Sequence, residues 1–248
     1  MTLINKPLAT IILAAGKGTR MDSDVPKVLH KVGGKPMIVH VIHTAKALGS
    51  NNIITVLGYK YKMVQETLEN ESVECVLQLK QLGTAHAVLQ CLKPLKYFQG
   101  NIMILYGDVP LTKIDTLSRL LKVHEMEGAS STILTTDLPD PTGYGRIVRN
   151  IDHSLMKIVE ENDATEQERK ISEINSGIYV FDAQVLFRLL PLVGNNNKQN
   201  EYYLPDVLNL IIQEKGKVAI DKINNYIEIQ GVNNMGQLTE VNELYKNS

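Results

Sequence analysis

Two patterns of hydrophobic positions alternate along the first half of the chain. Short uninterrupted apolar runs, flanked by polar or turn residues, predict buried β-strands. These runs are Ala9–Leu13, Asn52–Leu57, Val73–Val76, Ile102–Tyr106 and Thr132–Thr135. Between them, apolar residues recur at helical spacing over Met37–Leu48 and Lys113–Glu127, and a glycine follows each segment. Strands that alternate with helices predict an α/β fold with a mixed, mainly parallel, Rossmann-like sheet flanked by helices.

The pattern changes after residue 138. The segment Pro139–Gly145 is rich in turn residues, and the strands Arg146–Arg149, Met156–Val159 and Ile174–Phe181 follow it, with no long helix between the first two. Closely spaced strands of this kind are typical of antiparallel pairing, so we expect a smaller antiparallel lobe. We therefore divide the single domain 1–248 into a first lobe of about 1–138, a second of about 139–230 and a closing segment of about 231–248.

The composition narrows the functional class. The chain has 248 residues and a formal net charge of −1 with both signs abundant, which leaves no electrostatic footprint for nucleic acid or an anionic membrane. Lys6 and Pro7 interrupt the N-terminal apolar residues, and no apolar run approaches the ~20 residues that span a bilayer. Cys75 and Cys91 lack a C-x-x-C or histidine spacing, which predicts buried free thiols. We expect a cytoplasmic protein without nucleic-acid or membrane partners.

The strand at Ala9–Leu13 runs into a glycine-rich turn with cations around it. The turn continues through Gly16, Gly18 and Arg20, and Pro26-Lys27 follows. Backbone N–H groups of such small residues can surround phosphate oxygens, while Lys17, Arg20 and Lys27 can neutralise a polyphosphate. Neither of the two standard nucleotide-binding glycine motifs fits the spacing. The local sequence therefore allows either a phosphate-binding loop or a plain strand-to-helix turn.

Two further segments place polar groups at the carboxyl ends of predicted strands, where open α/β sheets bind ligands. Asp108 follows the strand that ends at Tyr106 and could hold a hard cation, or could be a turn or cap residue. Gln78 and the segment Gln81–Thr84 precede a helix that begins near Ala85. A glutamine amide complements a pyrimidine edge, although Thr84 is equally suited to cap the helix.

The run Leu13–Met21, with the following Pro26-Lys27, resembles the signature of the sugar-nucleotide pyrophosphorylases. Continued to His30, it is most similar to the uridylyltransferase half of the bacterial bifunctional N-acetylglucosamine-1-phosphate uridylyltransferase/glucosamine-1-phosphate acetyltransferases. Further matches to that family follow in the same order, at Gln81–Thr84, Leu105–Leu111, Pro141–Ile147, Glu173–Asn175, Glu201–Tyr203 and Gly231–Asn234. The resemblance covers nearly all of the chain.

The resemblance implies a nucleotide-diphospho-sugar transferase fold and a Mg²⁺-dependent enzyme of cell-wall (peptidoglycan) precursor synthesis. This enzyme makes UDP-N-acetylglucosamine and pyrophosphate from UTP and N-acetylglucosamine 1-phosphate. The implied catalytic residues are Arg20, Lys27 and Asp108. The implied nucleotide-binding residues are Leu13, Ala14, Ala15, Gly16, Lys27, Gln78, Gly83, Thr84, Tyr106 and Gly107. The sugar-binding lobe would supply Gly145, Glu160, Asn175 and Tyr203, joined by Asn233, and the metal ligands would be Asp108 and Asn233.

Departures from the family pattern leave alternatives open. Ala85 stands where a second glycine is common, so its methyl group could narrow the base pocket, and Pro205 stands where threonine is frequent. His86 is interpreted as a packing residue on the helix face. The alternatives to the implied reaction are an enzyme that uses another sugar or polyol phosphate, an enzyme that uses another nucleotide, and a catalytically silent binding module. The hexapeptide repeats of the family's acetyltransferase domain do not follow Asn234, so we expect no acetyltransferase activity and a monomer or weak homo-oligomer.

Overall fold

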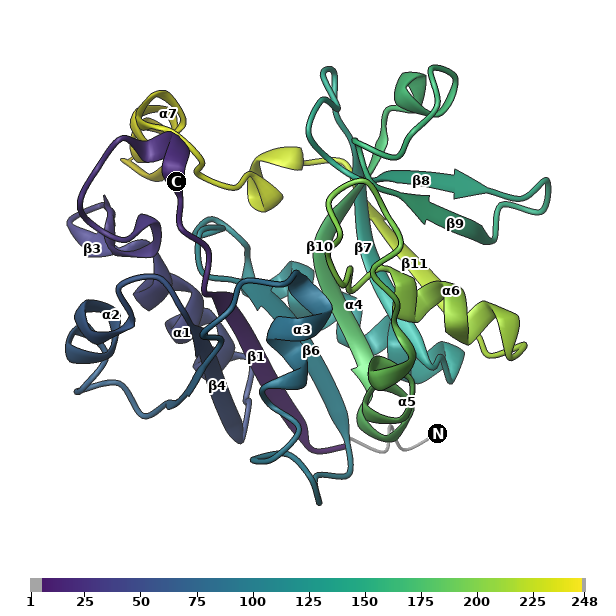
Figure 1. Cartoon of the computed structure of the whole chain (residues 1–248), viewed down its shortest axis with the longest axis horizontal. Helices are drawn as coiled ribbons and strands as arrows, with labels where there is room; N and C mark the ends of the chain where they lie inside the picture. Colours follow the sequence, from purple (N-terminus) through teal and green to yellow (C-terminus); the bar gives the residue numbers. More distant parts are fainter. Residues whose placement is uncertain (1–5, 247–248) are drawn as a thin grey trace.

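The computed structural model describes residues 6–246, and a nine-stranded sheet runs through the middle of them (Figure 1). Along the main path of this sheet the order is β11 (Val218–Ile223), β7 (Ser131–Asp137), β10 (Glu173–Asp182), β6 (Asn101–Tyr106), β1 (Leu8–Ala14), β4 (Asn52–Leu57) and β5 (Glu74–Leu77). The strands predicted in the first half of the sequence are confirmed to within two residues at each end.

The sheet is mixed, as expected. β1 pairs in parallel with β4 and β6, β4 with β5, and β11 with β7. β10 runs antiparallel to both of its neighbours, β6 and β7. The sequence prediction placed this strand in a separate antiparallel lobe, whereas it lies in the main sheet. Val180 and Phe181 are fully buried on opposite faces of β10, and only a central strand can be covered on both faces.

The second lobe is consequently smaller than the boundary at 138 suggests. Its β8 (Arg146–Arg149) and β9 (Leu155–Val159) form a hairpin that projects from the sheet and touches it through the pairing of Ile174 with Arg146 (Figure 1). β11, which the hydrophobic pattern did not reveal, returns the chain to the edge of the main sheet. The two lobes therefore share one sheet.

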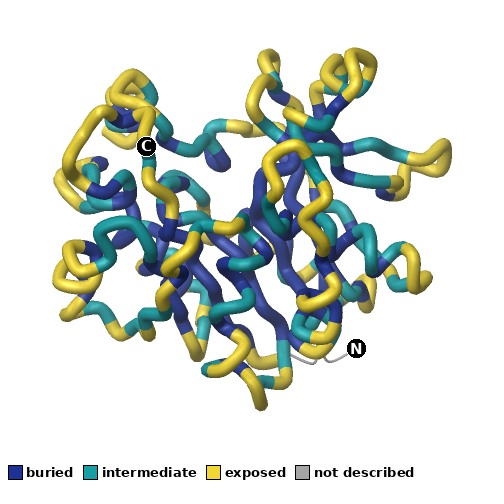
Figure 2. The backbone as a smooth tube through the Cα atoms, viewed as in Figure 1, coloured by how far each residue is buried: buried dark blue, intermediate teal, exposed yellow. Residues whose placement is uncertain are grey.

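Helices cover both faces of the sheet because its strands alternate their buried side chains. On β1, Ile12 and Ala14 face α1 (Met37–Ala47), α2 (Tyr61–Thr67) and α4 (Ile114–Glu127). Ile11 and Leu13 face the opposite layer, which contains α3 (Thr84–Leu89), α5 (Ala183–Leu189) and α6 (Asp206–Gln213). The sheet is the buried centre of the molecule (Figure 2). The patterning missed α2, α5 and α6, which are at most eight residues long.

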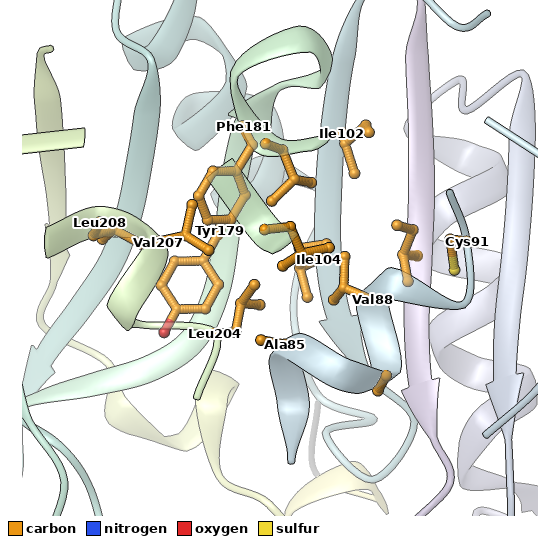
Figure 3. Close-up of a cluster of buried hydrophobic side chains, with 14 of the residues drawn as sticks. Ala85, Val88, Cys91, Ile102, Ile104, Tyr179, Phe181, Leu204, Val207 and Leu208 are labelled. Carbon is orange, nitrogen blue, oxygen red and sulfur yellow. The ribbon is translucent and has the colours of Figure 1, made fainter. Parts of the chain in front are cut away.

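One hydrophobic cluster joins the layer of α3, α5 and α6 to its face of the sheet (Figure 3). Val88 of α3 lies beside Ile104 of β6, with the rings of Tyr179 and Phe181 on β10 on the other side of Ile104. Ala85 and Cys91 belong to the same cluster. Leu204 and α6 complete the cluster. Cys91 is a buried free thiol as predicted, and Cys75 is free and half-buried.

The last helix, α7 (Met235–Lys246), packs against the N-terminal part of the chain (Figure 1). Leu238 and Val241 bury themselves with Met21 and with residues around the short β2 (Lys31–Val32) and β3 (Lys35–Pro36). This contact anchors the loop that follows β1. None of the helices within residues 6–246 has the length and apolar character needed to cross a membrane.

Candidate active site

A cavity of about 420 Å³ opens where β1 and β6 end. Its walls come from the loops after these two strands, the start of α3, the β8–β10 region and the segment before α7. Most of the residues singled out from the sequence line it together: Leu13, Ala14, Ala15, Gly16, Lys27, Gln78, Gly83, Thr84, Tyr106, Asp108, Gly145, Glu160, Asn175 and Asn233. Residues from one end of the chain to the other thus converge on one hollow.

The loop after β1 forms one wall and is shaped by two different glycines. Gly18 has a positive φ of 61°, and a Cβ there would lie 2.7 Å from the Cβ of Lys27. Glycine at this position lets the Lys27 segment lie directly against the loop. At Gly16 a Cβ would meet nothing within 4 Å, and its φ is not in the left-handed region. The fold itself therefore does not require glycine at position 16, where the backbone is open to the cavity.

The Lys27 ammonium group lies between two side-chain oxygens that come from distant parts of the chain. Its ammonium group pairs with the carboxylate of Asp108 and donates to the amide oxygen of Asn233 at 3.0 Å. Arg20 donates to the same amide oxygen at 3.3 Å. The N–H of Val232 donates to the carbonyl of Asp108 at 3.0 Å, and this hydrogen bond holds the segments of Asp108 and Asn233 side by side. A carboxylate and an amide oxygen that converge on one cation form the donor set that a hard divalent ion such as Mg²⁺ prefers.

The start of α3 forms the second wall. Gln78 is only 3% exposed, and its amide nitrogen donates to the carbonyl of Gly83 and to Nδ1 of His86, both at 3.0 Å. The Thr84 hydroxyl accepts the N–H of Leu204 at 2.9 Å. Gly83, rather than Thr84, is the N-cap residue of the helix. The suggested capping role of Thr84 is therefore wrong, because this hydroxyl ties α3 to the segment after Tyr203.

At the other end of the cavity lie the polar side chains of Glu160, directly after β9, and of Asn175 on β10. Burial raises the pKa of Glu160 to about 7, and the nearby carboxylates of Asp206 and Asp163 add to this shift. A Cβ on Gly145 would lie 3.0 Å from a carboxylate oxygen of Glu160, so glycine makes room for it.

The Asn175 amide has a fixed orientation. Its side-chain oxygen accepts the Gly177 N–H at 2.9 Å and the Tyr179 hydroxyl at 2.8 Å. Within residues 6–246 no hydrogen bond from the amide N–H₂ to another protein group is found, and Asn175 lines the cavity.

Three residues from the sequence analysis do not line the cavity. Arg20 is exposed beside it and reaches it through Asn233. Gly107 packs under the floor, where a Cβ would lie 3.2 Å from Val28. Tyr203 lines a neighbouring hollow, which shares Glu160 with the cavity, and its hydroxyl donates to Gln199 at 2.6 Å, so its role in sugar binding stays a prediction.

Ala85 also differs from expectation. The sequence suggested that its methyl group would narrow the base pocket, but this methyl is 2% exposed and points into the core (Figure 3). Pro205 lines the neighbouring hollow with Tyr203.

Gln81, named in the sequence analysis with the segment before α3, also lines the cavity. The other lining residues had no role assigned from the sequence: Val28, Ala87, Val109, Gly143, Tyr144, Ser176, Gly177, Glu201, Ile229 and Gly231. Gly177 carried a usable signal, because a glycine inside an apolar strand often marks close approach of another group. A Cβ there would lie 2.6 Å from the ring of Tyr106. Val109, Gly143, Tyr144, Glu201 and Gly231 lie within the segments that carry the family resemblance, where no single role was assigned to them.

Comparisons with known proteins agree with this arrangement. A family model described as nucleotidyl transferase matches residues 9–226. The chain is 49% identical over 237 residues to the bifunctional protein GlmU of Alkaliphilus metalliredigens, and the matched region covers 96% of this chain and 52% of that protein. It is 47% identical to the bifunctional protein GlmU of Staphylococcus carnosus, covering 94% and 51%. The chain therefore spans about half the length of the curated relatives it matches.

Among solved structures, one similar chain is described as a glucose-1-phosphate thymidylyltransferase from Bacillus anthracis in complex with sucrose. The match has a TM-score of 0.77 and covers 97% of this chain and 96% of that one, at 20% sequence identity. At this identity the likeness supports the fold.

Proposed function

The chain belongs to the nucleotidyl transferase family, and on that premise we propose that it forms UDP-N-acetylglucosamine and pyrophosphate from UTP and N-acetylglucosamine 1-phosphate. The observation that carries the proposal is the meeting of Lys27, Asp108 and Asn233 in one cavity with the open glycine loop. A simple binding module would not need a carboxylate, an amide oxygen and a lysine at one point beside an open glycine loop.

The reaction would need positioning and charge neutralisation more than covalent chemistry. The attacking phosphate of a sugar 1-phosphate is already an anion, so no protein nucleophile or strong base is required. The backbone around Gly16 and the guanidinium of Arg20 would hold the leaving β- and γ-phosphates. The Lys27 ammonium would lie against the α-phosphate, where negative charge grows in the transition state.

Mg²⁺ fits the residues present. The Lys27 ammonium already lies where the oxygens of Asp108 and Asn233 converge, and these two side chains would hold the metal. Two protein ligands suit Mg²⁺, which commonly keeps waters and takes its other ligands from substrate phosphates. When bound, it would supply positive charge between the two phosphate groups that react.

The sugar would lie against Asn175 and Glu160. The free amide N–H₂ of Asn175 suits a carbonyl acceptor such as that of an N-acetyl group. Glu160, half-protonated near neutral pH, can accept or donate a hydrogen bond to a sugar hydroxyl. The Asn175 N–H₂ group favours an acetylated amino sugar over one that carries a free ammonium group, because an N–H donor cannot accept a hydrogen bond from ammonium.

Such a product is an activated amino sugar of the kind that peptidoglycan assembly consumes, which suits a cytoplasmic enzyme. The word "bifunctional" in the names of the relatives applies to proteins about twice as long. The proposal concerns the one activity that this cavity supports.

The deciding experiment is a substrate matrix with Mg²⁺ and release of pyrophosphate as the readout. UTP, CTP, dTTP and ATP are each paired with the 1-phosphates of N-acetylglucosamine, glucosamine and glucose. We expect the highest kcat/KM for UTP with N-acetylglucosamine 1-phosphate, with about tenfold or greater preference over the glucosamine compound. Equal values for these two sugars would refute the sugar assignment, and no turnover of any pair would favour a silent module.

A further inference from the structure

His86 on α3 lies behind the residue proposed to meet the base. We propose that His86 is a positioning residue that holds the Gln78 amide in one orientation and so selects a base with an N–H donor, such as uracil, over cytosine. The inference rests on the proposed function, because it concerns the nucleotide end of the same cavity. It assigns a role to a side chain that the sequence analysis interpreted as packing.

The hydrogen bonds of Gln78 leave its amide one way to face. A primary amide nitrogen has two N–H groups. One donates to the carbonyl of Gly83 and the other to Nδ1 of His86, both at 3.0 Å. Within residues 6–246 no protein hydrogen bond reaches its Oε1, and Gln78 lines the cavity. The cavity therefore meets Gln78 as an acceptor.

An acceptor at this point discriminates between pyrimidines. Uracil and thymine carry N–H at N3, which donates to a carbonyl oxygen, whereas cytosine has a lone pair there. If the amide turned by 180°, its N–H₂ group would face the cavity and would suit cytosine. The Gly83 carbonyl opposes this turn because it would then face an oxygen. Nδ1 of His86 opposes it in the same way in the tautomer that accepts at Nδ1.

The ring of His86 is fixed by the packing of α3. Ala85 and Val88 lie in the core on either side of His86 in the sequence, and the Thr84 hydroxyl is bonded to Leu204 (Figure 3). Burial lowers the pKa of His86, so the imidazole is neutral at neutral pH and can accept at Nδ1.

Gln90 contacts the other side of the ring. Its amide nitrogen donates to the backbone carbonyl of His86 at 2.8 Å and lies 3.3 Å from Nε2. A neutral imidazole accepts at one nitrogen only. The shorter contact at Nδ1 assigns that role to the Gln78 side, because the Gln90 amide already has an acceptor in the backbone.

The test uses three variants. His86→Leu removes the acceptor and keeps a similar volume. His86→Asn restores an oxygen near the position of Nδ1. Gln90→Leu is the matched control, since it alters the other contact of the ring on the same helix. For each protein, kcat and KM are measured with UTP and CTP at fixed sugar 1-phosphate, and binding of UTP and CTP is measured by calorimetry.

We expect His86→Leu to lower the UTP-to-CTP ratio of kcat/KM about tenfold, mainly through KM for UTP, as suits one oriented hydrogen bond. His86→Asn should keep most of the wild-type ratio, and Gln90→Leu should leave it unchanged. An unchanged ratio in a folded His86→Leu protein, or equal losses in the Leu and Asn variants, overturns the inference. If His86→Leu does not fold, the His86→Asn and Gln90→Leu ratios decide it, because a lost ratio in His86→Asn then also overturns it.

The two proposals fail in different ways. A wild-type protein that turns over UTP while the His86 variants keep its base preference refutes only the role of His86. A wild-type protein with no turnover refutes the proposed function, and calorimetry then decides the inference. Wild-type binding that does not favour UTP over CTP overturns it.

Discussion

At the scale of single residues, the glycines of the cavity divide by what requires them. Gly18 and Gly177 have positive φ angles, and a Cβ at either would lie within 3 Å of Lys27 or Tyr106. The fold needs these glycines. Gly16 has open space around it and an ordinary φ, so the fold would accept a side chain there. The absence of a side chain matters only to a molecule that enters the cavity.

We therefore expect Gly16→Ala to change the free energy of unfolding by less than about 1 kcal/mol, because the site is unstrained and open. Its methyl group would stand between the backbone and phosphate oxygens, so UTP binding should weaken about tenfold or more. Urea unfolding and calorimetry measure the two effects. Gly194→Ala, equally open but outside this cavity, is the control. Equal UTP affinities in both variants would contradict a phosphate-binding role for the loop.

Lys27→Met tests the cation at the centre of the site. Loss of charge that acts in the transition state should lower kcat about 10²–10³-fold, with a smaller change in KM. Without nucleotide, the variant should bind Mn²⁺ more tightly than wild type, because the ammonium no longer occupies the space between Asp108 and Asn233. Kinetics and electron paramagnetic resonance of free Mn²⁺ give the readouts. Lys31→Met, on the exposed face of β2, should change neither. A normal kcat would argue against the transition-state role.

The raised pKa of Glu160 should make the free energy of unfolding depend on pH. Its pKa in the fold, about 7, is raised from an ordinary 4.5, so the folded state binds the proton more tightly. The contribution of this group is fully present below pH 4.5 and is lost as the pH rises through 7. Relative to Glu160→Gln, the wild-type free energy of unfolding should therefore fall across that window by at most about 3 kcal/mol. Urea unfolding at pH 5 and pH 8 tests it, and parallel changes in both proteins would count against the buried carboxyl.

At the scale of elements, α3 depends on its neighbours. It has six residues, too few for a stable isolated helix. The core holds Ala85 and Val88, while Thr84 bonds to Leu204 and the N–H of Ala85 donates to the carbonyl of Tyr202. The adjoining Glu201 also lines the cavity, so α3 connects one wall of the cavity to the segment near Glu160.

Gly83→Ala should break this connection. The φ of Gly83 is +108°, and a Cβ would lie 2.4 Å from the Tyr202 carbonyl oxygen, which is backbone and cannot rotate away. We expect a loss of about 1–3 kcal/mol in the free energy of unfolding and higher KM values for both substrates. The control Gly128→Ala has a φ of +55° but open space, so it isolates the conformational cost. If both variants lost the same stability, the close contact with Tyr202 would not matter.

At the scale of the whole molecule, one wall of the cavity is held in place by contacts between α7 and the segment that follows β1. α7 packs on the loop after β1 through Met21, and Val232 bonds to Asp108. The Asn242 side chain accepts the Gly33 N–H at 3.0 Å and donates to the Lys31 carbonyl at 3.1 Å. These contacts keep Asn233 against Lys27.

Asn242→Ala should therefore loosen a site that it does not touch. The variant loses these two hydrogen bonds and the one that the side chain donates to the Leu238 carbonyl at 3.0 Å. We expect a cost of about 1–3 kcal/mol, which for a chain of this size corresponds to a Tm lower by several degrees. We also expect a higher KM for UTP, because Asn233 is less firmly placed. Calorimetry and kinetics check both effects against Asn195→Ala in an exposed loop. An unchanged Tm would show that α7 is held by its apolar face alone.

Much of this architecture could be predicted from the sequence because it depends on local patterns. Apolar runs revealed β1, β4, β5, β6 and β7 but not the two-residue strands β2 and β3, and small residues next to cations marked the loop around Gly16. Since parallel strands end at a common edge, the meeting of that loop with Asp108 could be expected as well. Burial along a run of neighbours is a property that the run itself encodes.

The rest was decided by the tertiary structure. The pattern of β10 does not say that it pairs with β6 rather than with a separate lobe, since partners compete across the whole chain. The outward turn of Tyr203 and the inward methyl of Ala85 depend on which face each element buries. The bond from Lys27 to Asn233 and the orientation of the Gln78 amide arise from contacts between segments that no local pattern relates.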